Sequence, residues 1–352
     1  METDINVRKT EHIRICLTDH VEGVNKTTGL EGISFIHNAL PEINFNDIQL
    51  ETTFLNKKLQ APFLVSSMTG GSDLASKINI NLATASEEKG WAIGLGSTRA
   101  LLESKAHVES FLIRTYAKTV PLIANIGAVQ FNYGYGVEEC QRIVDLTEAD
   151  SLVLHLNSLQ EVVQDEGDVN FANLLPKIEE VCKKLSVPVG VKEVGFGIDG
   201  TVADQLYQVG VAYIDVAGAG GTSWSQVEKL RSKDPLRKAA AEAFNSWGIP
   251  TKDCIVSVKS KLPKTPIVAS GGMKTGLDAA KAITIGADLV GFARLLLQAA
   301  TESVESVIDV MEQIEFELRM TMFGIGAKNI QSLQNTKRVS IMGRSLLDEN
   351  EK

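Results

Sequence analysis

Glycines and an arginine near the end of the sequence are placed to bind a phosphate group. Ser270-Gly271-Gly272 follows the short apolar run Ile267–Ala269, and Arg294 comes just after a second run, Leu289–Phe292. Glycines let backbone N–H groups approach phosphate oxygens, and the N-termini of the helices that follow add positive potential. A tight turn would explain one Gly-Gly pair, but the repeated unit with Arg294 favours a phosphate site.

Polar side chains also follow two apolar runs in the middle of the chain. Lys192 ends one run, where a fixed cation can face a phosphate or a reduced flavin ring; a solvated rim lysine is the alternative. His155 and Asn157 share one face of a strand, although a buried structural histidine is equally consistent. Gln160 and Glu161 follow directly, and a carboxylate here can hold Mg²⁺ together with substrate oxygens, or be a solvated charge.

A basic cluster near the N-terminus is unexpected in this acidic chain. Arg8, Lys9 and His12 lie within five positions, and Arg99 follows another apolar run. A solvated arm is one interpretation, and an arm that folds over the site and pairs with a phosphate is the other. Two separate groups of cations indicate a phosphorylated cofactor together with a phosphorylated substrate.

The elements that would position these residues form a repeating pattern. Helical patterns alternate with eight short apolar runs, which are Phe63–Val65, Ala92–Leu95, Pro121–Ala124, Leu152–Leu156, Pro188–Val191, Ala212–Val216, Ile267–Ala269 and Leu289–Phe292. Eight βα units predict a (β/α)8 barrel, a TIM barrel whose chemistry lies at the carboxyl ends of the strands. An open doubly wound sheet is less consistent, since it has fewer strands and a GxGxxG after the first.

The barrel would occupy most of the chain. We expect residues 1–60 to form a loop-like N-terminal arm and lead-in, residues 61–335 to form the barrel with a last helix at 301–323, and residues 336–352 to form a tail that is mobile after Gly343. The helical patterns include Val137–Leu146, Phe171–Leu185 and Val202–Val209. Thr275 and Asp278 have the spacing of a capping box.

Composition excludes several classes of protein. The net charge of −9 lacks the excess of positive charge that is typical of proteins that bind nucleic acid. No apolar run is long enough for a membrane span. Four scattered cysteines have no metal-binding spacing and fit a reducing compartment, and the N-terminal segment lacks the apolar core of a secretory signal. We therefore expect a cytoplasmic protein that acts on a small molecule.

Several motifs occur together in a characteristic order. They are Arg8-Lys9-x-x-His12, Ser67-Met68-Thr69-Gly70-Gly71, Gly96-Ser97, His155-Leu-Asn157 with Gln160-Glu161, Lys192-Glu193-Val-Gly, Gly220-Gly221-Thr222-Ser223-Trp224, Ser270-Gly271-Gly272, Ala293-Arg294 and the late Gly-Ala-Lys-Asn at 326–329. From about residue 5 to about residue 335 the chain resembles the type 2 isopentenyl-diphosphate isomerases. More distantly it is similar to FMN barrels of the lactate-oxidase and IMP-dehydrogenase type. The chain differs from the family at two places. Ser67 stands where alanine is common, and Gly324-Ile325 stand where bulkier residues are usual.

The resemblance implies an activity and a set of ligands. It implies interconversion of isopentenyl and dimethylallyl diphosphate by a 1,3-proton shift, with FMN that is reduced by NADPH, with Mg²⁺, and in a homo-oligomer, a tetramer or octamer. The residues it implies for FMN are Ser67, Met68, Thr69, Ser97, Asn125, Lys192, Thr222, Gly271, Gly272, Met273, Ala293 and Arg294. Those it implies for the substrate are Arg8, Lys9, His12, Ser97, Thr98, Arg99, His155, Asn157 and Gln160. Glu161 would hold Mg²⁺, and His155, Gln160 and Lys192 would take part in catalysis, Gln160 as a helper because an amide is a poor acid or base.

Three other functions are less consistent with the sequence. A 2-hydroxy-acid oxidase would need a histidine near the seventh strand, but the last histidine is His155. An enzyme of the IMP-dehydrogenase type needs a nucleophilic cysteine on a mid-chain loop, and Cys182 and Cys254 do not fit that position. A non-catalytic FMN-binding or phosphate-binding barrel would leave His155, Gln160 and Glu161 without a purpose.

Overall fold

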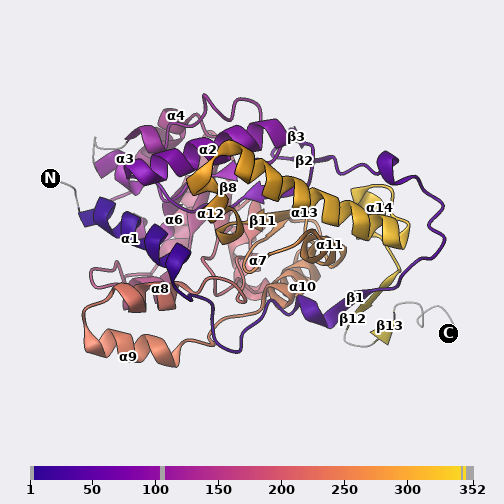
Figure 1. Cartoon of the computed structure of the whole chain (residues 1–352). Coiled ribbons are helices and arrows are strands. Elements are labelled where there is room, and N and C mark those ends of the chain that lie inside the picture. Colours follow the sequence, from indigo (N-terminus) through magenta and orange to yellow (C-terminus); the bar gives the residue numbers. More distant parts are fainter. Residues whose placement is uncertain (1–3, 104–107, 342–343, 346–352) are drawn as a thin grey trace.

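A closed barrel of eight parallel strands forms the centre of the molecule (Figure 1). The structure is a computed structural model, and it describes residues 4–103, 108–341 and 344–345. The barrel strands, in chain order, are β4 (Phe63–Val65), β5 (Ala92–Gly94), β6 (Leu122–Gly127), β7 (Ser151–His155), β8 (Val189–Lys192), β9 (Tyr213–Asp215), β10 (Ile267–Ala269) and β11 (Leu289–Phe292). β11 pairs with β4 to close the ring, so the predicted (β/α)8 barrel and all eight apolar runs are confirmed.

Alternation along the strands fills the barrel with side chains. Ile123, Val153, Tyr213 and other inward residues form an apolar layer together with Phe54 of a hairpin, β2 (Thr52–Phe54) and β3 (Lys57–Leu59), that packs against it. A Cβ on Gly190 would lie 2.1 Å from the Tyr213 ring, so glycine at this position makes room for the aromatic side chain. The layer is a packed core. It supports the side chains that lie two residues further along each strand, toward the carboxyl end of the barrel.

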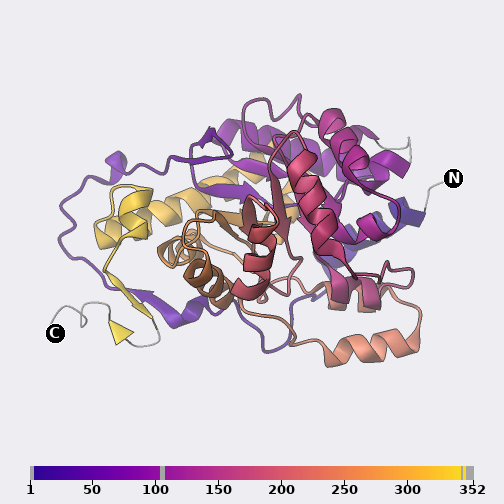
Figure 2. The same ribbon diagram turned by 180° about the vertical axis from the view of Figure 1, so that it is seen from behind.

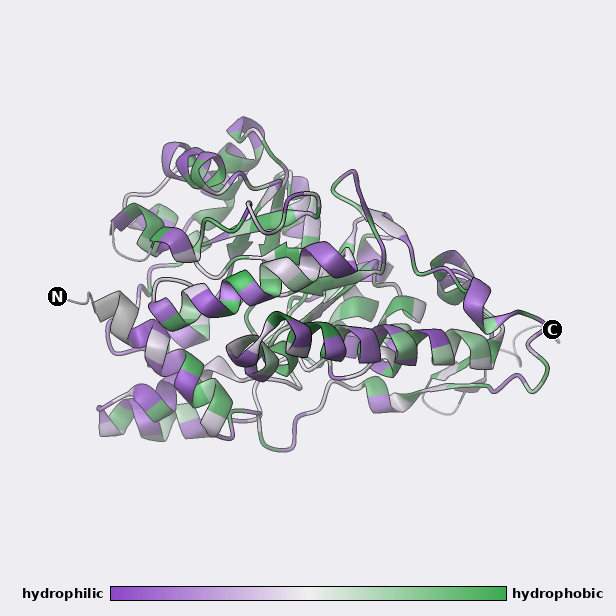
Figure 3. Cartoon of the chain, turned by 45° about the horizontal axis from the view of Figure 1, so that its top comes forward, coloured by the Kyte–Doolittle hydropathy of each residue, from purple (hydrophilic) through white to green (hydrophobic). Residues whose placement is uncertain are grey.

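Amphipathic helices surround the barrel. They include α2 (Asp73–Lys89), α3 (Arg99–Glu103), α4 (Val137–Thr147), α5 (Ser158–Val163), α6 (Leu174–Lys184), α7 (Gly200–Gln208), α8 (Trp224–Arg231), α9 (Pro235–Ala243), α10 (Thr251–Lys261), α11 (Gly276–Thr284), α12 (Arg294–Glu302), α13 (Val304–Ile325) and α14 (Ile330–Gln334). Figure 3 shows their mixed hydropathy around a barrel that is mostly apolar. The three helical patterns, the last helix and the capping box of Thr275 and Asp278 are confirmed. The long connection between β9 and β10 carries α8, α9 and α10.

The expectation of a loop-like N-terminal segment was wrong. Residues Asp4–Thr18 form the helix α1, which packs against α8 and α12 at one end of the barrel (Figure 1). The helix has little apolar periodicity because the face it turns toward the barrel is mostly polar. Periodicity alone therefore could not distinguish this helix from a polar loop.

The lead-in and the C-terminal segment pair with each other. β1 (Ile33–Phe35) forms an antiparallel ladder with β12 (Val339–Ile341), and the indigo and yellow segments lie side by side in Figures 1 and 2. The expected tail thus begins with an ordered strand, and β13 (Arg344–Ser345) extends this small sheet. The rest of the tail expected after Gly343 lies outside the described residues. Within the described ranges, no helix is long and apolar enough to cross a membrane.

Candidate active site

A polar layer lies directly above the apolar filling of the barrel and forms the floor of a cavity. Ser66, Asn125, His155, Lys192 and Ser270 each stand two residues beyond an inward apolar residue or, for Lys192, beyond Gly190. All five line one cavity of about 580 Å³, within the usual size range of ligand sites. The two-residue period of the strands thus converts an apolar core into a polar floor at the carboxyl end of the barrel.

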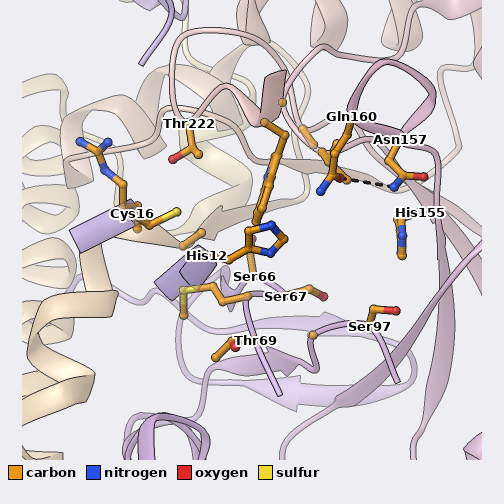
Figure 4. A pocket seen from close by; sticks show the side chains of 18 of the residues that line it. His12, Cys16, Ser66, Ser67, Thr69, Ser97, His155, Asn157, Gln160 and Thr222 are labelled. Atoms are coloured by element: carbon orange, nitrogen blue, oxygen red, sulfur yellow. Dashed lines mark hydrogen bonds between the residues drawn. The ribbon is translucent and has the colours of Figure 1, made fainter. Parts of the chain in front are cut away.

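The cavity collects the residues predicted from the sequence, with one exception. Those that line it are Arg8, Lys9, His12, Ser67, Met68, Thr69, Ser97, Arg99, Asn125, His155, Asn157, Gln160, Glu161, Lys192, Thr222, Gly271, Gly272, Met273, Ala293 and Arg294. Figure 4 shows Gln160, Asn157 and His155 gathered on one side, with Cys16 and Thr222 on the other. Thr98 does not line the cavity; it is fully buried and its hydroxyl donates to the Asn125 carbonyl oxygen at 2.7 Å. A substrate contact for Thr98 therefore has no support in this geometry.

His155 is a neutral hydrogen-bond acceptor toward the cavity. The Asn125 amide donates to the Leu95 carbonyl oxygen at 3.1 Å, so its Oδ1 faces His155 Nδ1 at 2.8 Å and accepts from it. This network assigns the proton to Nδ1 and leaves Nε2 with a free lone pair. Burial, with the nearby charges of Lys192 and Arg99, lowers the pKa of His155 to about 3. His155 therefore adds no positive charge for a diphosphate, and it can accept a hydrogen bond.

Lys192 supplies a cation at the floor. The residue is 8% exposed, and its ammonium donates to the Glu193 carbonyl oxygen at 2.5 Å. The carboxylate of Glu193 accepts backbone N–H groups of Val194, Gly195 and Phe196, which fixes the loop after β8. Burial raises the pKa of Glu193 to about 7 although these N–H groups favour its charged form. The loop holds the backbone oxygen that positions the lysine.

The helix α1 brings a second set of groups over this floor. Arg8, His12 and Cys16 recur every four residues, so they share one helical face, and all three line the cavity. Lys9 lies beside them, where its ammonium donates to the Ser97 carbonyl oxygen at 3.0 Å and lies 4.7 Å from the centre of the Phe111 ring. Arg99 holds Asp168 at 2.7 Å and Glu103 at 3.0 Å. The spacing of residues 8, 12 and 16 was the sequence signal that could have predicted this helix.

Lys9 is expected to take up a proton when an anion binds. Burial, with the charges of Arg8 and Arg99, lowers the pKa of Lys9 to about 7. A bound diphosphate favours the charged ammonium and raises this pKa, so at about pH 8 binding draws a proton from the solvent. Titration calorimetry with inorganic diphosphate, in buffers of different ionisation enthalpy, should show this uptake. The Lys9→Met variant should lose it, and a wild-type heat that does not depend on the buffer would contradict the assignment.

Glu161 is held as a carboxylate acceptor at the edge of the cavity. Asn157 Nδ2 donates to its Oε1 at 2.8 Å, and the Asp168 backbone N–H donates to its Oε2 at 2.7 Å. Burial raises the pKa of Glu161 although these two donors favour the ionised form. The described part of the chain contains no cluster of three or more His, Cys, Asp or Glu residues that would hold a metal. A cation here would therefore have to complete its shell with ligand oxygens and water.

Sequence reasoning missed Glu228, a fully buried carboxylate on α8. It accepts from Gln160 Nε2 at 3.0 Å, and it lies 2.9 Å from His12 Nε2 and 2.7 Å from Arg231 Nη1. Burial opposes its ionisation, but His12, Gln160 and Arg231 outweigh that and lower the pKa of Glu228 to about 2. Glu228 on α8 thus links its own helix to α1 through His12 and to α5 through Gln160. A glutamate on a helix carries no sequence signal for such a role.

The loops after β10 and β11 form a cradle suited to a phosphate. Gly271 and Gly272 have φ angles of 98° and 74°, and a Cβ on either would lie within 2.4 Å of a backbone oxygen. Arg294 Nη1 is buried without a hydrogen-bond partner among the described residues, as are Ser66 Oγ and Asn157 Oδ1. All three belong to residues that line the cavity. Unpaired buried polar atoms are costly, so their gathering here fits a polar ligand such as FMN.

The fold and this site define a class of protein. Residues 146–340 match the family of FMN-dependent dehydrogenases. A flavocytochrome b2 variant superimposes with a TM-score of 0.68 at 16% identity, covering 97% of this chain and 85% of that one. A putative lactate oxidase of Pediococcus acidilactici gives a TM-score of 0.66 at 16% identity, covering 92% of this chain and 88% of that one. The fold is that of the FMN-dependent barrels.

Curated relatives identify the family within this class. An isopentenyl-diphosphate delta-isomerase of Oceanobacillus iheyensis is 75% identical over 349 residues, covering 99% of this chain and 100% of that protein. An isopentenyl-diphosphate delta-isomerase of a Nostoc species is 49% identical over 329 residues, covering 94% of each. The chain belongs to the isopentenyl-diphosphate delta-isomerase family.

Proposed function

We propose that this protein interconverts isopentenyl and dimethylallyl diphosphate by a 1,3-proton shift that depends on reduced FMN and Mg²⁺, with NADPH as the reductant. The observation that carries the proposal is one cavity with two separate anion sites. The glycine cradle with Arg294 lies at β10 and β11, and the cations Arg8, Lys9 and Arg99 lie over β5 and α3. The first fits the phosphate of FMN and the second fits a diphosphate. A cytoplasmic location, which the scattered cysteines favour, and a homo-oligomer, which the family resemblance implies, are part of this proposal.

The need for a flavin follows from the chemistry of the substrate. An alkene is a very weak base and its neighbouring C–H groups are very weak acids, so no ordinary side chain matches either task near neutral pH. Reduced FMN supplies a ring nitrogen that can give and take a proton with no net redox change. His155 does not act as an acid at the floor, because it is neutral and presents a lone pair.

In this proposal the residues of the chain bind the substrate, hold it in position and exclude water from the cavity. Arg8, Lys9 and Arg99 would bind the diphosphate, and Lys192 would stabilise negative charge on a reduced flavin held at the floor. Gln160 is held at both ends of its amide, by Glu228 at 3.0 Å and by Asn157 at 3.3 Å, which fixes its orientation without making it an acid. Ile13 and Cys16 of α1 line the cavity, and excluding water from it would protect a carbocation-like reaction from trapping by solvent.

Product formation tests the function directly. The purified protein should be reduced without oxygen, mixed with isopentenyl diphosphate and Mg²⁺, and assayed for dimethylallyl diphosphate, with the oxidised protein as the control. Flavin released by heat should be FMN. Conversion in the oxidised protein alone, or released FAD, would reject the proposal. Bleaching of the flavin by lactate would instead favour a hydroxy-acid oxidase.

Replacing Glu161 should change the Mg²⁺ requirement while FMN stays bound. Glu161→Gln keeps the shape and removes the charge, so the half-saturating Mg²⁺ concentration should rise by roughly tenfold, the size of a lost charge-assisted contact. Asp165, which is exposed on the loop nearby and bonded to Ser232 at 2.6 Å, gives a matched control as Asp165→Asn. An unchanged Mg²⁺ dependence in Glu161→Gln would place the metal elsewhere.

A further inference from the structure

Glu22 is paired with both cations at the glycine cradle. It follows α1, lines the cavity, and its Oε1 lies 3.0 Å from Arg294 Nη2 and 3.1 Å from Lys274 Nζ. The backbone of Glu22 forms an isolated antiparallel bridge with Thr222, which lines the same cavity. The position of the carboxylate is therefore fixed through the main chain as well as through its two ion pairs.

The guanidinium of Arg294 is only half used by this contact. Nη2 bonds to Glu22, whereas Nη1 is buried and has no hydrogen-bond partner within the described residues. A planar guanidinium binds phosphate best with two parallel N–H groups. A phosphate that used both nitrogens of Arg294 would meet the carboxylate of Glu22 at Nη2.

We propose that Glu22 is an internal competitor for the phosphate of FMN and sets the affinity and selectivity of the cradle. The proposal rests on FMN as the cofactor. Glu22 holds Arg294 and Lys274 in place, and these three side chains together carry one net positive charge. A phosphate dianion must displace the carboxylate from Nη2 or bind beside it, and either course costs binding free energy.

The sign of the effect follows from this charge balance. Glu22→Gln raises the net charge of the cradle by one and removes the competing acceptor, so FMN should bind more tightly. The ion pairs are partly exposed, since the side chains of Glu22, Arg294 and Lys274 are 24%, 36% and 56% exposed, and screening limits their strength. Two such pairs predict an affinity for FMN that is roughly 5- to 20-fold higher. Riboflavin has no phosphate, so its affinity should not change.

The test measures flavin binding by the protein after its flavin has been removed. Quenching of flavin fluorescence gives the Kd of FMN and of riboflavin for wild type, Glu22→Gln and Glu312→Gln. Glu312 pairs with Lys89 at 3.2 Å on the outer helix α13, so its variant is a matched loss of one surface carboxylate. We expect tighter FMN binding in Glu22→Gln alone, a steeper loss of affinity with added salt, and stronger competition by inorganic phosphate.

An FMN affinity in Glu22→Gln equal to or below that of wild type would overturn the inference. So would an equal gain for riboflavin, since the phosphate would then not be the group that competes. If Glu22→Gln does not fold, Glu22→Asp, which keeps the charge on a shorter stem, should bind FMN more tightly than wild type, and an unchanged Kd counts against the proposal. Failure of wild type to bind FMN would reject the cofactor itself, and lack of isomerase activity with FMN bound would reject only the proposed reaction.

Discussion

Lys192→Met should lower the midpoint potential of the bound flavin by roughly 30–60 mV, the equivalent of one charge-assisted contact of about 1.5–3 kcal/mol in a two-electron couple. The reason is that Lys192 is a buried cation on the floor of the cavity, and a fixed positive charge favours an anionic reduced ring over a neutral oxidised one. Isomerisation should slow by at least about a hundredfold, the usual cost of removing one electrostatic stabiliser. Redox titration and single-turnover assays measure the two effects.

Lys177 provides the matched control for this change. Its ammonium is also partly buried, and it donates to the Phe131 carbonyl oxygen at 2.6 Å, but it does not line the cavity. Lys177→Met should leave the potential unchanged, and Lys192→Arg should recover only part of it because the guanidinium is larger and differently shaped. A wild-type potential in Lys192→Met would show that the lysine does not face the flavin.

Glu228→Gln should destabilise the protein by about 3 kcal/mol, as expected when one partner of a buried ion pair is removed, and should raise the KM for the substrate. The carboxylate is shared by His12, Gln160 and Arg231, so its loss removes the more buried of the two carboxylates that pair with Arg231 and loosens α1 from α8. Glu11, 46% exposed and 3.0 Å from the same Arg231, supplies the control as Glu11→Gln. Urea unfolding and steady-state kinetics distinguish the two variants.

The same group predicts a dependence of stability on pH. The pKa of Glu228 is about 2 in the folded protein and lower than in the unfolded chain, so the carboxylate stabilises the fold above the unfolded pKa. This stability is lost as the pH falls from about 4.5 to about 2. Wild type should therefore lose more unfolding free energy than Glu228→Gln over that range. If the two proteins lost the same unfolding free energy over this pH range, the result would contradict the role of Glu228.

The sequence predicted the barrel well because its strands carry a local signal. Each strand is a short apolar run buried on both faces, and residues such as His155 and Lys192 stand at the end of a run, where a barrel places its chemistry. The capping box at Thr275 is likewise a local pattern. These features need no knowledge of the rest of the fold.

The parts that sequence reasoning missed depend on distant partners. α1 turns Arg8 and His12 toward a cavity while Ile13 and Ile15 pack into two different apolar clusters, so it has no single strong helical stripe. The tautomer of His155 is set by Asn125, thirty positions earlier, through one hydrogen bond. Glu22 and Glu228 resemble ordinary surface acids in the sequence, because only the fold brings Arg294 to Glu22 and brings His12 and Gln160 to Glu228.

The closure of the barrel by β4 and β11 has a consequence for synthesis on the ribosome. Leu64 of β4 pairs with Gly291 of β11. One edge of the first barrel strand therefore stays unpaired until the last strand has been synthesised. At about 5–20 residues per second, the nascent chain spends roughly 10–45 s with an incomplete, open-edged sheet. Unpaired strand edges invite association with other chains. The emerging protein is therefore most exposed to aggregation, and most in need of a chaperone, until residue 292 leaves the exit tunnel.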